Sequence, residues 1–193
     1  MRVSQEKQLA ALAKVARSVL QQFYRNDCCV AATRVGVTLL ESWGFRNVKP
    51  ILTRAIACNT QWVQGLREVP AHIVTVDVDS PGPGIAGHLC LTGKIGSQKF
   101  LLDLSAFQLN RPSKGILVPE AMMVELSKPL VGDWGVQVDL YDGGRLFWGA
   151  HPRPEKVPWS SASDWVMPKT RQRVVHDDVA VLLETATLGA LGL

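Results

Sequence analysis

The sequence of 193 residues lacks the features that would assign it to a membrane, secreted or disulfide-rich class. It has no apolar run near the length that spans a bilayer, and the segment after Met1 carries Glu6 and Lys7 where a secretory signal would be apolar. Its four cysteines form neither C-x-x-C pairs nor a disulfide framework. We therefore expect a soluble, cytoplasmic protein with reduced thiols, no membrane partner and no cofactor.

An excess of charge of one sign is also missing. Lys and Arg number 21 against 17 Asp and Glu, which gives a net charge of +4. The densest basic stretch holds only Lys169, Arg171 and Arg173, which is typical of a solvated surface segment, so a nucleic-acid partner is disfavoured. Hydrophobic residues make up 47% of the chain, enough to build a core, and the length favours one domain over residues 1–193.

Helical and strand-like patterns succeed one another along the chain. Apolar residues at helical spacing predict a helix over 4–24 with Ser4 as its cap, and a second helix over 28–43 that Asp27 caps and Gly44 ends. We expect strands over 48–57, 71–78, 88–95, 99–104, 137–141 and 145–149, a short helix over 119–126, a loop over 151–170, and a last helix from Asp177 or Asp178. This order predicts an α+β fold in which N-terminal helices pack on an antiparallel sheet.

Three types of reactive side chain fall where folding can bring them together. Cys28 and Cys29 lie at the predicted start of a helix, where unpaired N–H groups and the helix dipole favour a thiolate. His88 opens a strand after a loop rich in Pro and Gly, and we expect Asp103 to be its direct cross-strand neighbour in a hairpin that turns near Gly96. Thiol, imidazole and carboxylate are the nucleophile, base and orienting group of covalent catalysis.

Two pairs of segments resemble a known superfamily. Residues 27–33 read Asp-Cys-Cys-Val-Ala-Ala-Thr and 39–45 read Leu-Leu-Glu-Ser-Trp-Gly-Phe, while 87–89 read Gly-His-Leu and 100–103 read Phe-Leu-Leu-Asp. They are similar to the core of the transglutaminase-like, papain-fold cysteine enzymes, a superfamily that includes arylamine N-acetyltransferases. The resemblance implies a papain-like core over 27–112, followed by a hairpin, loop and helix over 133–193. Counted back from Gly44, the nucleophile of the family pattern falls on Cys29, with Cys28 as the alternative.

Residues and resemblance together predict a thiol-dependent hydrolase, a peptidase or amidase. Cys29 would form a thioester with a peptide, amide or acyl substrate, His88 would act as base, and Asp103 would orient His88. The backbone N–H of Cys29 is the first expected oxyanion donor, joined by the side chain of Asn26, Gln22 or Gln61. Two alternatives stay open. One is an acyltransferase or transglutaminase-type amide exchange on the same triad, and the other is a non-catalytic papain-fold module that binds a protein partner.

A metal site made by Cys28, Cys29 and His88 is disfavoured, because adjacent cysteines rarely point at one ion in tetrahedral geometry. The chain also has six tryptophans. The pattern places Trp43 in the helical core and Trp62 in a loop, where anchoring is favoured over a binding wall.

Overall fold

The computed structural model describes all residues except 1–3, 25–27, 66–72, 77–86, 131–134 and 152–175. Its α-helices are α1 (Gln5–Phe23), α2 (Cys29–Ser42), α3 (Thr60–Gln64) and α4 (His176–Ala190). Its strands are β1 (Arg46–Cys58), β2 (Ile73–Val76), β3 (His88–Ile95), β4 (Gln98–Asp103), β5 (Met122–Glu125), β6 (Val136–Asp139) and β7 (Arg145–Ala150). Among these described helices, none is both long and apolar enough to cross a membrane.

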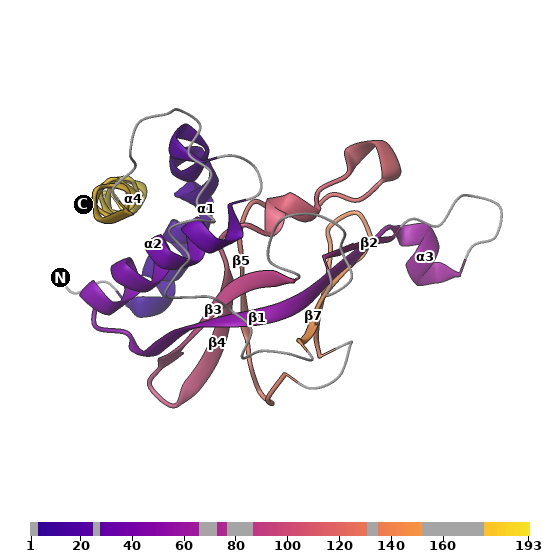
Figure 1. The fold of residues 1–193 in the computed structure, drawn as a ribbon, viewed down its shortest axis with the longest axis horizontal. Coiled ribbons are helices and arrows are strands. Elements are labelled where there is room, and N and C mark those ends of the chain that lie inside the picture. The colour runs from indigo at the N-terminus through magenta and orange to yellow at the C-terminus, as the bar shows by residue number, and fades with distance from the viewer. Residues whose placement is uncertain (1–3, 25–27, 66–72, 77–86, 131–134, 152–175) are drawn as a thin grey trace.

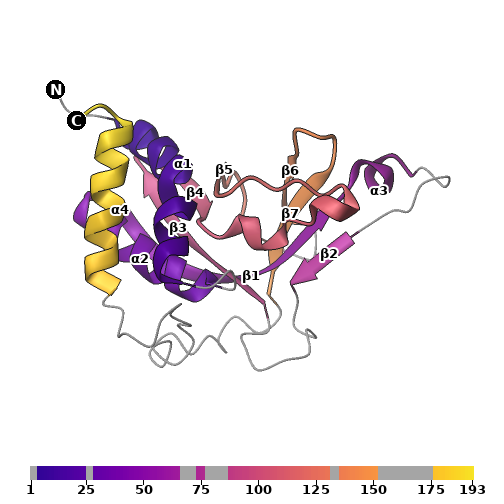
Figure 2. The same cartoon turned by 90° about the horizontal axis from the view of Figure 1, so that it is seen from above.

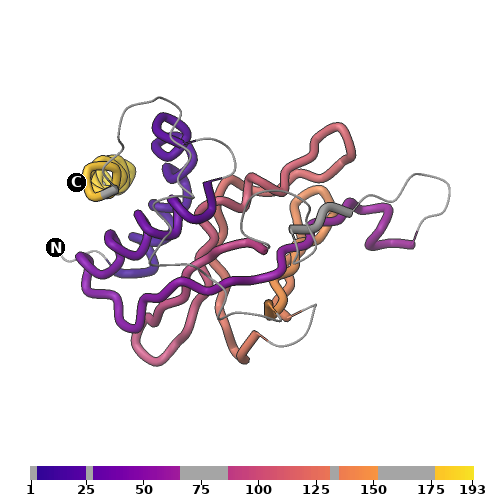
Figure 3. Tube along the Cα trace, in the orientation of Figure 1, coloured from indigo at the N-terminus to yellow at the C-terminus, as the bar shows by residue number. Residues whose placement is uncertain are grey.

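The strands form one curved, antiparallel sheet that is organised around β1. The order is β5-β4-β3-β1-β7-β6, and β2 pairs with the end of β1. The first half of β1 pairs with β3 and its second half pairs with β7, so that Thr53 lies between His88 on one side and Ala150 on the other. Figure 3 shows β1 crossing the whole sheet and running out to α3. Residues far apart in the sequence therefore meet at the middle of β1.

Three helices cover one side of the sheet. Figures 1 and 2 both show α1, α2 and α4 grouped there, while α3 extends beyond the opposite end of β1. The helices bury apolar residues such as Leu12, Val35 and Leu183 against Leu91 and Leu102 of the sheet. The predicted α+β fold, with N-terminal helices packed on an antiparallel sheet, is confirmed.

A second apolar cluster lies on the other face of the sheet. Because side chains alternate along a strand, β4 directs Leu102 towards the helices and Leu101 to this second cluster. The cluster also contains Cys90 of β3 and Trp148 of β7, both buried. The centre of the sheet is therefore covered on both faces, and polar groups placed there are removed from water.

Local signals explain most element boundaries. The Ser4 hydroxyl accepts a hydrogen bond from the N–H of Lys7, as the predicted cap requires. Gly44 follows α2 with a φ of +77°, the left-handed conformation that commonly ends a helix. The second helix begins at Cys29 with Cys28 in the capping position, one residue later than expected, and the predicted cap Asp27 lies outside the described residues.

One predicted element is wrong. The helix expected over 119–126 is instead the short strand β5, which pairs with β4 in the register Leu101↔Val124. Met122 and Val124 are half-buried while Met123 and Glu125 are exposed, so the burial alternates with period two. Edge pairing with β4 thus overrides the weak helical preference of this short segment.

Candidate active site

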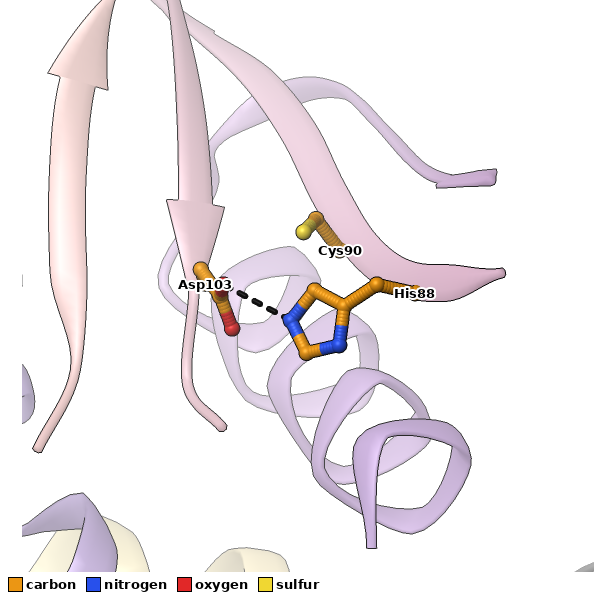
Figure 4. Close-up of side chains that lie close together, drawn as sticks. All are labelled: His88, Cys90 and Asp103. Atoms are coloured by element: carbon orange, nitrogen blue, oxygen red, sulfur yellow. Dashed lines mark hydrogen bonds and ion pairs between the residues drawn. The ribbon is translucent and has the colours of Figure 1, made fainter. Parts of the chain in front are cut away.

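His88 and Asp103 form a buried hydrogen-bonded pair. His88 is the first residue of β3 and Asp103 the last of β4, and both side chains are completely inaccessible to solvent. The Nε2 atom of His88 lies 2.7 Å from Oδ2 of Asp103. Figure 4 shows this contact and shows the second ring nitrogen directed away from the carboxylate. Two residues that the sequence placed in one site are therefore in direct contact.

The strand register that brings His88 and Asp103 together differs from the predicted register. The β3–β4 turn pairs Ile95 with Gln98, and the register Leu91↔Leu102 continues to place Asp103 opposite Cys90, not opposite His88. The register is displaced by two residues from the prediction. Because side chains alternate with period two, this displacement keeps His88, Cys90 and Asp103 on one face. His88 then reaches Asp103 diagonally across the hairpin.

The residue before His88 is a glycine, which suits the backbone conformation at the start of β3. Gly87 has a φ of +134°, in the region that favours glycine, and a β-carbon there would lie 3.2 Å from the carbonyl oxygen of Thr53. The Thr53 hydroxyl donates to the carbonyl oxygen of His88 at 2.9 Å. The backbone of His88 is therefore held closely against β1.

The Asp103 carboxylate is saturated with donors. Its Oδ1 accepts from the N–H of Ser105 at 2.9 Å and from the Ser105 hydroxyl at 3.3 Å. Its Oδ2 accepts from the indole N–H of Trp148 at 3.0 Å as well as from His88. Burial alone would raise the pKa of Asp103, but the His88 imidazole and the other donors lower it below its usual 3.8. The carboxylate is therefore held in its ionised form.

The pKa of His88 is shifted in the opposite direction, upwards. Burial by itself would lower the pKa of the imidazole, but the Asp103 carboxylate, with smaller contributions from Cys90 and Cys29, raises it well above 6.5. The Asp103 carboxylate therefore stabilises the protonated form of His88, which makes the imidazole a stronger base.

Cys29 also influences the imidazole of His88. It is the first residue of α2 and is half-buried. A side-chain interaction of Cys29 contributes to the raised pKa of His88, while Nδ1 of His88 is buried and has no hydrogen bond of standard geometry in the described structure. The hydroxyl of Thr33, one turn along α2, donates to the carbonyl oxygen of Leu89 at 3.0 Å and holds the first turns of α2 to the start of β3.

The remaining cysteines differ from Cys29 in burial and surroundings. Cys28 is buried in the helical core beside Tyr24, whose pKa is raised by burial and by Cys28. Burial raises the pKa of Cys58, and its thiol lies 3.4 Å from the carbonyl oxygen of Arg145. Burial and the Asp103 carboxylate raise the pKa of Cys90 to about 12. Of the four cysteines, only Cys29 is not fully buried.

Of the three side chains predicted as oxyanion donors, the structure describes Gln22 and Gln61. Gln22 is exposed on α1, and its amide donates to the carbonyl oxygen of Ser18 in its own helix at 2.8 Å. Gln61 belongs to α3, beyond the end of β1 that lies farthest from α2 (Figures 1 and 2), so the fold does not bring it to Cys29. Asn26 lies outside the described residues. The first hydrogen bond of α2 runs from the N–H of Ala32 to the carbonyl of Cys28, which leaves the Cys29 N–H without a partner inside the helix.

One group among the described residues could hold a metal ion, and it coincides with this cluster. Ligand atoms of His88, Cys90 and Asp103 all lie within 4.8 Å of one another. Nitrogen, sulfur and oxygen are ligand types that zinc accepts. Here, however, Nε2 of His88 and both Asp103 oxygens already make hydrogen bonds within the protein. An ion would have to displace those bonds, so the donor set fits a hydrogen-bond network better than a metal centre.

Cys90, Ser105 and Trp148 belong to this cluster without having been predicted as site residues from the sequence. Period-two alternation could have found Cys90, because it lies two residues after His88 on the same strand. No comparable signal exists for Trp148, because it reaches Asp103 from a strand 45 residues later in the chain.

Comparison with family models, with curated proteins and with solved structures gives no match for this chain. The helices packed on an antiparallel sheet and the buried cysteine–histidine–aspartate group are consistent with a papain-like fold. That group has the composition of a catalytic triad.

Proposed function

We propose that this protein is a thiol-dependent hydrolase, a peptidase or amidase, with Cys29 as its nucleophile. One observation carries the proposal. A fully buried imidazole is hydrogen-bonded to an ionised carboxylate through Nε2, and a half-buried cysteine at a helix N-terminus contributes to its raised pKa. Of the four thiols, this is the one that combines partial exposure with an influence on the base.

The chemistry follows from these positions. Neutral His88 donates Nε2–H to Asp103, so Nδ1 carries the lone pair that takes the proton of the Cys29 thiol. The sulfur attacks the substrate carbonyl, and the negative oxygen that forms meets the N–H of Cys29 at the start of α2. When the tetrahedral species collapses, the carbon–nitrogen bond breaks and His88 returns its proton to the departing amine.

The second half-reaction removes the acyl group. A water molecule gives a proton to His88 and attacks the thioester, and the acid product leaves as Cys29 regains its proton. We propose water as the acceptor because hydrolysis requires no separate amine-binding site. Asp103 stays ionised throughout and stabilises the imidazolium in both halves.

Selective alkylation tests the nucleophile. With iodoacetamide at about pH 6, we expect Cys29 to react at least about tenfold faster than Cys58 and Cys90, as peptide mapping by mass spectrometry would measure. His88→Gln should remove that advantage, because the thiol then loses its proton acceptor. Equal and slow reaction of all four thiols would contradict the proposal.

Acylation tests the reaction itself. After exposure to p-nitrophenyl acetate or to an electrophilic peptide, intact-mass measurement should show one covalent adduct. The matched pair Cys29→Ala and Cys28→Ala distinguishes the adjacent thiols. The adduct should be lost in the first variant and kept in the second, and the reverse pattern would assign the chemistry to Cys28. An acetyl adduct that disappears in water without an added amine supports a hydrolase.

A further inference from the structure

Trp148 shares an acceptor atom with the proposed base. Its indole N–H donates to Oδ2 of Asp103 at 3.0 Å, the same oxygen that His88 contacts at 2.7 Å. Among the described residues, Trp148 is the largest side chain that is completely buried. A buried indole N–H needs an acceptor, and in the described residues this carboxylate supplies it.

The position of Trp148 follows from the sheet order. Trp148 pairs with Ala55 of β1, which lies on the same face two residues after Thr53. Thr53 and Ala55 both have short side chains. The indole can therefore extend across β1 and β3 to reach Asp103 of β4. Ala55, Trp148 and Leu101 pack in the same apolar cluster. The indole therefore enters the His88–Asp103 pair from the side opposite the helices.

The carboxylate is fixed at both ends by these contacts. Ser105 holds Oδ1 through its N–H and its hydroxyl, while Trp148 and His88 divide Oδ2 between them. A carboxylate with donors on both oxygens cannot rotate without losing at least one charge-assisted hydrogen bond. Its plane in turn sets the direction in which the imidazole presents its second nitrogen.

We infer that Trp148 is a positioning residue for the proposed thiol chemistry: its indole N–H holds Asp103 so that His88 faces Cys29. This inference rests on the proposed function, since it assigns Trp148 a role in the same site. It also makes β7 part of the catalytic unit, although β7 lies outside the core segment 27–112 that the sequence analysis delimited.

The test removes the indole N–H and keeps the aromatic bulk. In Trp148→Phe we expect the rate of Cys29 alkylation to fall by about tenfold to a hundredfold, the effect of one hydrogen bond to a charged group. The low-pH limit of that reactivity should move to higher pH, because Asp103 then accepts a proton more readily. Trp62→Phe is the matched control, since it makes the same change in an indole that packs on Phe147, and it should alter neither quantity.

A second variant distinguishes loss of the hydrogen bond from loss of folding. Replacing Trp148 by β-(3-benzothienyl)alanine keeps the shape of the indole and exchanges only the N–H for sulfur. The His88 Nε2 proton resonance reports the Asp103 contact independently of Cys29 and should shift in this variant. A reactive wild-type Cys29 whose rate and pH profile stay unchanged in both Trp148 variants would overturn the inference. An unreactive wild-type Cys29 would instead overturn the proposed function.

Discussion

Asp103 links the stability of the protein to its proposed chemistry. Its two oxygens accept from His88, Trp148 and Ser105, so the charge is compensated although no water reaches it. A buried charge is tolerated only when it is paired and hydrogen-bonded in this way. Removing one partner of such a pair leaves the other uncompensated, which costs more than the pair contributes.

The shifted pKa values of this pair predict how stability depends on pH. The pKa of His88 is raised above 6.5, so its contribution is fully present below 6.5 and is lost as the pH rises through the raised value. The pKa of Asp103 is lowered below 3.8, so its contribution is present above 3.8 and is lost as the pH falls through the lowered value. Urea unfolding over a pH series should therefore show the greatest contribution of the pair between these two limits.

Asp103→Asn should remove most of this dependence. We expect the free energy of unfolding to fall by about 3–5 kcal/mol within that window, because the imidazole loses its counter-charge. Asp139→Asn is the control, since that exposed carboxylate lies 2.6 Å from Nε of Arg145 at the surface and should contribute no more than about 1 kcal/mol. Equal losses in the two variants would show that the buried pair has no special role.

His88 and Asp103 are the members of the cluster that could be predicted from the sequence. His88 and Asp103 lie on the two strands at the open end of one hairpin, whose Gly-Ser turn is visible in the sequence, so their proximity is a local property. Trp148 reaches the same carboxylate only because β7 pairs with β1. No pattern within a single segment encodes that pairing, which explains why its hydrogen bond could not be foreseen.

The packing of α2 on the sheet determines how close Cys29 comes to His88. Gly36 lies in the buried face of α2, and a β-carbon there would be 2.6 Å from Cδ2 of Leu91 and 2.7 Å from Cδ1 of Leu104. The helix can approach the sheet this closely because the residue has no side chain. The hydrogen bond from Thr33 to β3 depends on the same approach.

Gly36→Ala should therefore destabilise the protein in spite of the better helix propensity of alanine. We expect a loss of about 1–3 kcal/mol from overpacking against the two leucines. The matched change is Gly189→Ala in α4, where a β-carbon meets nothing within 4 Å, and it should be neutral or stabilise by up to about 1 kcal/mol. Thermal unfolding would measure both changes. If Gly36→Ala were as stable as Gly189→Ala, the close approach of α2 would not limit the packing.

The elements that the sequence predicted well are those with strong local signals. The ranges of α1, β3, β4 and β7 agree with the expected segments to within about two residues, because their periodicity and turns are clear. β5 was missed because a four-residue strand has too few residues to establish its period, and its pairing with β4 decides its structure. The predicted loop over 151–170 lies almost entirely outside the described residues.

The layer of helices brings together the first and the last described helices of the chain. α1 and α4, the first and last described elements, pack side by side, as Figure 2 shows. α4 also contacts α2, where the indole N–H of Trp43 donates to a carboxylate oxygen of Glu184 at 2.8 Å. The helix that carries Cys29 is therefore supported on one side by the sheet and on another by α4.

This support can be tested with two adjacent leucines of α4. Leu183 is fully buried in the helical core, whereas Leu182 is 47% exposed. Leu183→Ala should lower the free energy of unfolding by about 2–5 kcal/mol, and Leu182→Ala by no more than about 0.5 kcal/mol, as urea denaturation would measure. If α4 holds α2 in place, Leu183→Ala should also slow Cys29 alkylation under native conditions while Leu182→Ala leaves it unchanged. A folded Leu183→Ala protein with wild-type alkylation would show that the sheet alone positions Cys29, because the thiol would then be insensitive to a cavity between α4 and the other helices.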